Sequence, residues 1–239
     1  MREHIKEFIK LCIDTFDAPE PIYEFGSLQV EGQEEFADLR PFFKEKKYIG
    51  CDMREGPGVD VILDLHDIDL PSNSVGTVLL LETLEHVEYP YKALDEIFRI
   101  LKPEGLIIMS SCLNFPIHGH PYDYWRFTPE AFKSLLKRFK TQFVGYLGED
   151  DFPHTILGFG IKNKEISIEQ FELKFQKWKE EKETEFKNQI IPVEQYISRL
   201  KYWKSLGYRN SKAFIIWIFP PFLLPIIQFL YNRKRFIKI

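Results

Sequence analysis

The sequence predicts an α/β fold in which a mostly parallel sheet is followed by a helical extension. Three observations support this prediction. Short apolar segments alternate with amphipathic helical segments up to residue 139, as strands and crossover helices do in parallel sheets. Two strand-like segments then follow each other directly, which indicates a terminal antiparallel pair. Beyond residue 163 the chain is helical in pattern and rich in charged residues.

The first predicted elements alternate from the N-terminus onward. Apolar residues at helical spacing predict a helix over residues 2–16, and a second helical segment is expected at Gln33–Phe43. Strands are predicted at Pro21–Gly26, Tyr48–Cys51, Val59–Leu63 and Ser74–Leu81. The last of these strands is continuously apolar, which is typical of a strand covered by helices on both faces.

The later elements complete the sheet and form the extension. Helices are expected at Pro90–Leu101, Thr128–Phe139, Ser167–Lys187 and Pro192–Leu206. Strands are predicted at Leu106–Ser111, Gln142–Leu147 and Thr155–Ile161. Thr128 has the position of an N-cap, because a proline follows it at the first helical position. We therefore expect a sheet domain at residues 1–163 and a helical extension at residues 164–239.

Charge is distributed unevenly along the chain. From Gln195 onward there are nine Lys and Arg residues and no Asp or Glu, so the first 194 residues carry a net charge of −13, against −4 for the whole chain. Within this basic tail, Ala213–Tyr231 is almost wholly apolar, although its three prolines disfavour a straight membrane-spanning helix. We expect the tail to bind an anionic membrane surface, to form a homodimer, or to pack as a lid on the sheet domain.

Composition also excludes several classes of function. The acidic body would repel phosphates, so no nucleic-acid partner is expected. The N-terminal residues are charged, so no signal peptide is expected. Cys12, Cys51 and Cys112 are too widely spaced for a zinc site or a disulfide framework, which predicts a cytoplasmic protein without a metal site. If the tail binds lipid, the protein would lie on the inner face of the cell membrane.

Ligands of open α/β sheets bind beyond the carboxyl ends of the strands, so residues at those ends are candidate binding residues. Gly26 and Ser27 follow the first strand, and a glycine there lets backbone amides approach a ligand. Asp52 follows the second strand and can accept hydrogen bonds from ribose hydroxyls, while Asp64 and Leu65 follow the third and can hold an adenine edge. Their order predicts a nucleotide-type site. The candidate set also includes three neighbouring residues, Glu24, Met53 and Glu82.

A second set of candidates follows the fourth and fifth strands. His118 and His120 lie in a loop beside the expected cleft, where an imidazole titrates in the range useful for acid–base catalysis. His86 is a candidate for the same role or for capping the next helix. We predict that these three histidines are catalytic. Candidate substrate-binding residues are Asn114, Asp123, Tyr124 and Arg126.

The same loop permits a structural interpretation. Asp123 and Arg126 can form a clasp, and Trp125 can pack beneath the following helix. For Trp125 and Thr128 we favour the structural interpretation. Glu85 is expected to orient or cap neighbouring groups and not to react.

Several motifs together resemble a known enzyme family. They are E-F-G-S at 24–27, G-C-D at 50–52, L-P-S-N-S-V at 70–75, L-E-T-L-E-H-V at 81–87, A-L-D-E-I-F-R-I-L-K-P-E-G at 93–105 and H-G-H-P-Y-D-Y-W-R-F-T-P at 118–129. The chain resembles the class I S-adenosylmethionine-dependent methyltransferases of the small "methyltransferase domain" type. The last motif is similar to methyltransferases associated with bacterial surface-glycan genes.

The resemblance implies a Rossmann-like methyltransferase sheet with S-adenosylmethionine as cofactor. It places Gly26 at the amino-acid end of the cofactor, Asp52 at the ribose, and Asp64 and Leu65 near the adenine. The expected acceptor is a small molecule or a glycan hydroxyl. Because no G-x-G-x-x-G follows the first strand, a dehydrogenase is disfavoured.

The sequence departs from the family pattern at three positions. Leu28 replaces the second glycine of the first motif, Gly76 stands where an Asp often begins the fourth strand, and Glu104 replaces a glycine before the fifth. The first departure leaves an alternative open. In that alternative, the chain is a catalytically inactive cofactor-binding scaffold recruited to a membrane or a partner.

Overall fold

The computed structural model describes residues 3–29, 37–119 and 121–188. The chain divides into two compact units, Met1–Glu183 and Thr184–Ile239. The first unit contains the sheet. Of the second unit, the described residues belong to the end of helix α5 (Glu169–Asn188).

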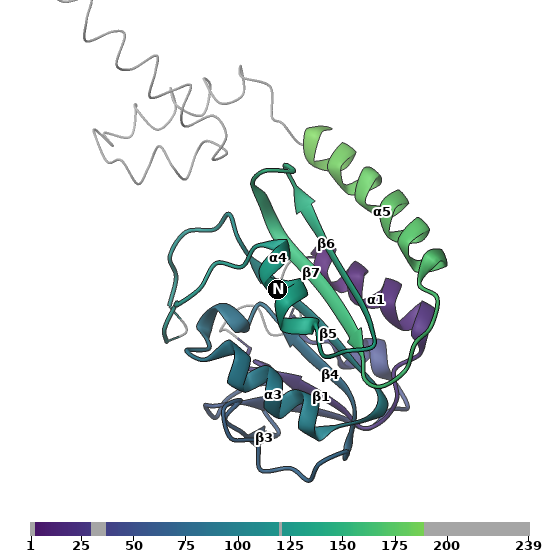
Figure 1. Cartoon of the computed structure of the whole chain (residues 1–239). Helices are drawn as coiled ribbons and strands as arrows, with labels where there is room; N and C mark the ends of the chain where they lie inside the picture. Colours follow the sequence, from purple (N-terminus) through teal and green to yellow (C-terminus); the bar gives the residue numbers. More distant parts are fainter. Residues whose placement is uncertain (1–2, 30–36, 120, 189–239) are drawn as a thin grey trace, which may run out of the picture. The chain divides into compact units, whose positions relative to one another are not determined.

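In the described part of the chain, seven strands form one sheet in the order β3-β2-β1-β4-β5-β7-β6 (Figure 1). The strands are β1 Ile22–Phe25, β2 Tyr48–Asp52, β3 Val61–Ile62, β4 Val75–Leu81, β5 Leu101–Cys112, β6 Thr141–Gly148 and β7 Pro153–Ile161. β7 pairs antiparallel with β5 and β6, and the other pairs are parallel. The predicted α/β sheet is confirmed. Its order reverses between β1 and β4, where a crevice is expected at the carboxyl ends of the strands.

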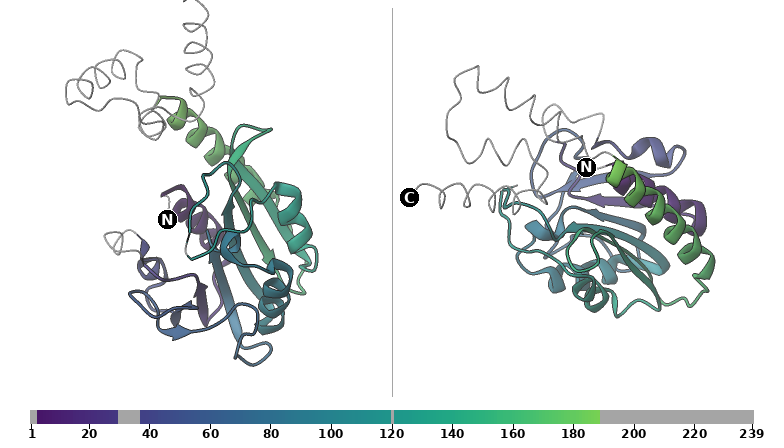
Figure 2. Two further views of the ribbon diagram at one scale, coloured as in Figure 1. Left: turned by 90° about the vertical axis from the view of Figure 1, so that its left-hand side faces the viewer. Right: turned by 90° about the horizontal axis from the view of Figure 1, so that it is seen from above.

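Helices cover both faces of this sheet, as two further views show (Figure 2). On one face α1 (Glu3–Phe16) and α5 bury Phe8 and Phe171 against Leu79 of β4. On the other face α3 (Pro90–Ile100) and α4 (Pro129–Leu136) bury Ile97 against Leu80. Successive side chains of β4 therefore alternate between two cores, and all of its residues are buried, as its apolar sequence predicts.

Helix α5 packs beside α1 through polar as well as aromatic contacts. Trp178 donates from Nε1 to Glu7 Oε2 at 2.9 Å, and Lys182 forms an ion pair with Glu7 at 2.8 Å. Phe171 and Phe175 are buried against the sheet. The boundary predicted after residue 163 lies between β7 and α5, and the beginning of the predicted extension thus contacts the sheet unit.

The connection from α3 to β5 is held by a buried lysine at the end of the sheet. Lys162 is 6% exposed. Its ammonium donates to the carbonyl oxygens of Phe98 at 2.6 Å and Leu101 at 2.7 Å, and to Asn73 Oδ1 at 2.9 Å. The lysine therefore satisfies two carbonyls where the helix ends and the strand begins.

Two of the departures from the family pattern have local explanations. Glu104 has a φ of 65°, which a glycine would adopt without strain, but its amide donates to Lys162 O and its carboxylate pairs with Lys164 at 2.7 Å. β5 is irregular here, and it begins at Leu101, earlier than predicted. At Gly76, a Cβ would lie 2.3 Å from the carbonyl oxygen of Pro19. The segment before β1 therefore leaves no room for the expected Asp.

Some predicted elements differ or lie outside the described residues. The strand predicted at Val59–Leu63 is reduced to Val61–Ile62, two exposed residues at the edge of the sheet. Of the helix predicted at Gln33–Phe43, the described part forms the short helix η1 (Arg40–Phe43). The predicted helix Pro192–Leu206 and the apolar segment Ala213–Tyr231 lie outside the described residues. Within the described ranges, the helices are too short or too polar to cross a membrane.

Candidate active site

A cleft of about 710 Å³ opens at the carboxyl ends of β1 to β4, within the size range of small-molecule sites. All eight predicted cofactor residues line it, namely Glu24, Gly26, Ser27, Asp52, Met53, Asp64, Leu65 and Glu82. The predicted acceptor-side residues that line it are His86, His118 and Tyr124. Asn114, Asp123 and Arg126 are not among the lining residues, and His120 lies outside the described part of the chain.

The turn after β1 is tight because Gly26 has a φ of 84°. The amides of Gly26 and Ser27 both donate to Cys51 O, at 2.8 and 3.0 Å. A Cβ at Gly26 would lie 2.2 Å from Thr83 Oγ1, so a side chain does not fit there. Ser27 Oγ is buried and has no hydrogen-bond partner among the described residues.

Glu24 is a buried carboxyl group in β1 that lines the cleft. Burial raises its pKa to about 7, although the Tyr48 hydroxyl, which donates to Oε2 at 2.5 Å, and the Arg40 guanidinium oppose this shift. Glu24 therefore changes its charge near neutral pH.

The raised pKa of Glu24 predicts a pH-dependent stability. Between the ordinary value of 4.5 and about 7, the folded protein retains a proton that the unfolded chain has released. The free energy of unfolding should therefore fall as pH rises through this window, by up to about 3 kcal/mol. In Glu24→Gln this decrease should be absent. Urea denaturation of both proteins at pH 4.5 and pH 7 tests the prediction, and parallel pH profiles would contradict it.

Asp52 ends β2 and is 9% exposed. The backbone amide of Arg54 donates to Oδ1 at 3.0 Å, and the Arg54 Nε donates to the same oxygen at 3.3 Å. Oδ2 accepts no hydrogen bond from the described residues. Asp52 therefore presents one carboxylate oxygen with acceptor capacity at the edge of the cleft.

Asp64 and His66 form a local pair after β3. The His66 amide donates to Asp64 Oδ1 at 2.8 Å and is the main cause of a lowered pKa of Asp64. His66 Nδ1 lies 2.9 Å from the same oxygen, and the Tyr89 amide donates to His66 Nε2 at 3.3 Å. These contacts assign the ring proton of the neutral imidazole to Nδ1, and they orient the loop beside Leu65.

The residue that follows β4 has an unusual backbone conformation. Glu82 has a φ of 48°, which is uncommon for a residue other than glycine. Its amide donates to Ser110 O at 3.0 Å, and Ser110 Oγ donates to Glu82 Oε1 at 3.2 Å. These contacts with β5 hold the turn that leads into the short helix η2 (Leu84–His86).

Glu85 of η2 connects the cofactor side of the cleft with the loop after β5. Its carboxylate is fully buried and accepts from Ser111 Oγ at 2.7 Å and from Cys112 Sγ at 3.7 Å. Its backbone carbonyl accepts from the amides of Tyr124 at 2.7 Å and Trp125 at 3.2 Å. These bonds agree with the orienting role that we expect for Glu85.

His86 and His118 meet at the same place, with ring centroids 4.8 Å apart. His86 Nδ1 lies 2.5 Å from Tyr122 O, a backbone atom of the loop after β5. His118 Nδ1 lies 3.1 Å from Pro116 O and 3.2 Å from Asp123 Oδ2. The structure therefore brings two of the three predicted catalytic histidines together at one wall of the cleft.

Asp123 and Arg126 form a bidentate ion pair at 2.5 and 2.7 Å. The Arg126 guanidinium holds the pKa of Asp123 far below its ordinary value. Arg126 also donates to Phe115 O and Pro116 O, and Asp123 accepts from the His118 amide at 2.7 Å. This is the clasp of the structural interpretation, and it positions His118. Direct contact of Asp123 or Arg126 with an acceptor stays a prediction.

The other two residues interpreted as structural have structural partners. Trp125 Nε1 donates to Val87 O at 2.9 Å. Thr128 is the N-cap of α4, where its hydroxyl accepts from the Ala131 amide at 3.2 Å and Pro129 follows it. The loop is therefore anchored at both η2 and α4.

Sequence reasoning did not identify several residues that line the cleft, among them Gln29, Arg54, Thr83, Val87, Glu88, Phe115 and Tyr122. Arg54 follows Asp52 by two residues, a spacing that suggests the observed pair. Thr83 has no such local indication, because its importance comes from its contact with Gly26 across the sheet.

Comparison with known proteins adds independent evidence. Residues 39–109 match a family model described as a methyltransferase domain. The fold is similar to a SAM-dependent methyltransferase from Archaeoglobus fulgidus, with a TM-score of 0.52 and 15% identity over 68% of this chain and 95% of that one. It is also similar to the CMeT domain of the citrinin polyketide synthase, with a TM-score of 0.51 and 12% identity over 67% and 52% of the two chains. A search of curated proteins found no match.

The matched segment runs from just before η1 into β5 and includes the cleft residues that follow β2, β3 and β4. Residues 39–109 therefore resemble a methyltransferase domain, and the fold of the described chain is similar to that of S-adenosylmethionine-dependent methyltransferases. Together these comparisons support S-adenosylmethionine as the cofactor.

Leu28, which replaces a glycine of the methyltransferase pattern, packs on the loop after β2. A Cβ at Gly56 would lie 2.4 Å from Leu28 Cδ1, and the Gln29 amide donates to Pro57 O at 2.9 Å. The side chain thus contacts a second glycine-containing loop, which supports the turn after β1.

Proposed function

We propose that this methyltransferase transfers a methyl group from S-adenosylmethionine to a hydroxyl group of a small molecule or a glycan. The observation that supports this proposal is the meeting of His86 and His118, 4.8 Å apart, in the cleft that the predicted cofactor residues also line. A hydroxyl is a poor nucleophile until it loses its proton, and imidazole groups act on protons near neutral pH.

The residues present fit the cofactor. Gly26, Ser27 and Asp52 line the cleft, and the buried Ser27 Oγ lacks a partner among the described residues. We propose that Glu24 and Gly26 hold the amino-acid end, that Asp52 Oδ2 accepts from ribose hydroxyls, and that Asp64 and Leu65 contact the adenine. Met53 and Glu82 complete the lining of this part of the cleft.

The cofactor supplies a methyl group activated by a positively charged sulfur. In the proposed reaction, the acceptor oxygen forms a bond to the methyl carbon while the carbon–sulfur bond breaks and its electron pair stays on sulfur. The hydroxyl proton passes to the imidazole of His118 or His86. The cleft contributes by holding the oxygen in line with the bond that breaks.

Aromatic side chains near the histidines support an acceptor with a ring. Phe115, Tyr122 and Tyr124 line the cleft and are 46%, 59% and 42% exposed. Such residues combine an apolar face with polar edges, which suits the faces and hydroxyls of a sugar. The glycan acceptor and the homodimer or membrane contact of the tail stay proposals.

The inactive-scaffold alternative was based on Leu28 in place of glycine. The packing of Leu28 against Gly56 gives this residue a structural role that does not require loss of cofactor binding. Calorimetric titration with S-adenosylhomocysteine tests the two functions, followed by a screen of hydroxyl acceptors with labelled methyl donor. The enzyme should bind the product and label an acceptor. A folded protein that does not bind S-adenosylhomocysteine would overturn the proposal.

Asp52→Ala should weaken binding of S-adenosylhomocysteine by about 1–3 kcal/mol, or roughly 5- to 150-fold in Kd, because charge-assisted hydrogen bonds to the ribose are lost. Asp69→Ala is a matched control, since Asp69 is an exposed carboxylate that does not line the cleft. Calorimetry on both variants measures the difference. Equal affinities in folded Asp52→Ala and the wild type would show that Asp52 does not bind the ribose.

A further inference from the structure

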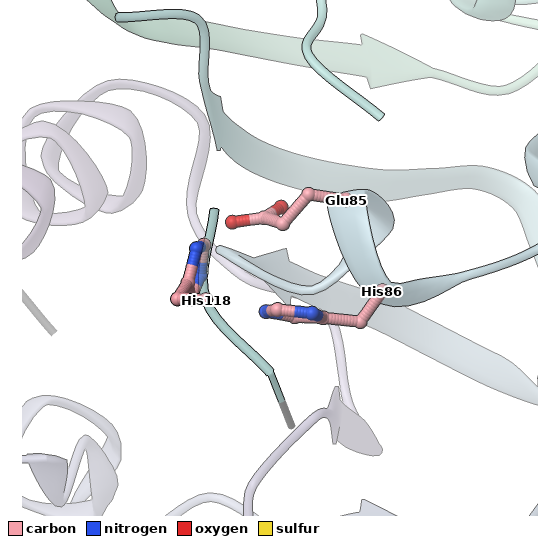
Figure 3. Close-up of side chains that lie close together, drawn as sticks. All are labelled: Glu85, His86 and His118. Atoms are coloured by element: carbon pink, nitrogen blue, oxygen red, sulfur yellow. The ribbon is translucent and has the colours of Figure 1, made fainter. Parts of the chain in front are cut away.

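Three side chains at the acceptor side of the cleft bring metal-ligand atoms close together. One atom each from Glu85, His86 and His118 lies within 4.8 Å of the others. Figure 3 shows the Glu85 carboxylate and the His86 ring both directed toward the ring of His118. Ligand atoms bound about 2.1 Å from one ion lie up to roughly 4 Å apart, so small side-chain movements would bring all three onto an ion.

Hydrogen bonds orient both imidazoles in the way that metal ligands require. A carbonyl oxygen only accepts, so the contact of His86 Nδ1 with Tyr122 O places a proton on Nδ1 and the lone pair of the neutral ring on Nε2. His118 Nδ1 likewise contacts only acceptor atoms in these two contacts, Pro116 O and the Asp123 carboxylate, which places its proton on Nδ1 as well. Histidine ligands of metals characteristically donate their second ring N–H to a carbonyl or a carboxylate.

The carboxylate of the trio is in an environment that favours a neighbouring cation. Glu85 is fully buried, and Ser111 and Cys112, which donate to its two oxygens, are uncharged groups. They satisfy hydrogen-bonding capacity, and the Arg126 guanidinium also interacts electrostatically with the carboxylate. A buried carboxylate is stabilised by nearby positive charge, which a metal ion or a protonated histidine supplies.

We propose that Glu85, His86 and His118 bind a divalent transition-metal ion, the class of cation that combines imidazole nitrogen with carboxylate oxygen ligands. Three protein ligands leave coordination positions open to the cleft. The spacing of the cysteines predicted no metal site, but this one requires no cysteine. The site combines Glu85 and His86 from η2 with His118 from the loop that the Asp123–Arg126 pair holds.

The role of the ion in catalysis rests on the proposed function. An acceptor hydroxyl bound at an open position would have a lowered pKa, so its proton would pass to water at neutral pH. His118 would then act by holding the ion through Nε2, and not by accepting the proton itself. The ion would also fix the position of the acceptor oxygen relative to the methyl group.

Titration of the full-length, chelator-treated protein with Co²⁺ tests the site, because the visible absorption of Co²⁺ reports nitrogen and oxygen ligands. The wild type should bind one ion per chain. In His118→Ala and Glu85→Gln the Kd should rise by about 10-fold or more. His66→Ala is the matched control, since His66 also lines the cleft beside a carboxylate, and it should retain wild-type affinity.

Thermal unfolding and calorimetry with S-adenosylhomocysteine accompany each titration. Glu85→Gln alters a buried hydrogen-bond network and could prevent folding. In that case His118→Ala provides the decisive comparison, because His118 lies in a loop. Absence of Co²⁺ binding to the wild type, equal affinity in His118→Ala, or a loss confined to His66→Ala would overturn the metal site. If S-adenosylhomocysteine still binds in those cases, the proposed function stands. If Co²⁺ binds and S-adenosylhomocysteine does not, the function fails and the metal site stands.

Discussion

Replacing Gly26 by alanine is expected to abolish detectable binding of S-adenosylhomocysteine and to lower the free energy of unfolding by about 2–4 kcal/mol. The new Cβ would lie 2.2 Å from Thr83 Oγ1. Thr83 cannot easily move, because its hydroxyl donates to Leu81 O at 2.9 Å and is 3.1 Å from Phe25 O. The φ of 84° adds a backbone cost for any residue with a Cβ. Urea denaturation and calorimetry measure the two effects.

A double variant separates the steric clash from the backbone strain at Gly26. Thr83→Ala removes Oγ1 and Cγ2, the two atoms nearest to the new Cβ. Gly26→Ala combined with Thr83→Ala should therefore recover part of the stability lost in the single variant, after correction for Thr83→Ala alone. If the two substitutions are simply additive, the contact between Gly26 and Thr83 does not explain the requirement for glycine.

Substitution of His118 by alanine should lower kcat by about 100-fold or more and leave the affinity for S-adenosylhomocysteine unchanged. The side chain lies beside His86 at the acceptor wall, whereas the predicted cofactor residues follow other strands. We expect kcat to fall whether the imidazole accepts the hydroxyl proton or binds a metal ion. Steady-state rates with the acceptor from the screen, together with calorimetry, test this expectation.

His154→Ala provides a histidine control for these rates, because His154 belongs to β7 and does not line the cleft. It should keep kcat within about threefold of the wild type. A kcat for His118→Ala within tenfold of the wild type would exclude a role of this imidazole in activating the acceptor. If His118→Ala instead loses much of its affinity for S-adenosylhomocysteine, the substitution disturbs the whole cleft and not the acceptor side alone.

The clustering of the predicted cofactor residues along one cleft could be predicted from the sequence because their positions are set locally. Gly26, Asp52 and Asp64 each follow a strand directly, and parallel strands bring their carboxyl ends to one edge of the sheet. Alternating apolar segments were sufficient to predict the order of the elements. The exact start of β5 was not predictable, because it depends on Lys162, a residue two strands later.

The acceptor half depends on contacts between distant segments, which a single sequence does not reveal. Asp123 and Arg126 have side chains suited to a substrate, yet they pair with each other and support His118. Glu85 meets Ser111 only when η2 packs against β5. The sequence therefore indicated which residues were candidates. It did not indicate which group each side chain contacts, because those contacts form only in the folded chain.

The buried ammonium of Lys162 makes the connection from α3 to β5 depend on a residue that is synthesised about 60 residues later. Helix α3 and β5 leave the ribosome before β7 does, and domains fold as their chains emerge. Until Lys162 arrives, the carbonyl oxygens of Phe98 and Leu101 depend on water, and one edge of β5 has no partner strand. A nascent chain that ends before β7 therefore carries an unpaired edge of β5. Synthesis of β7 and of Lys162, which directly follows it, supplies both the partner strand and the missing donor.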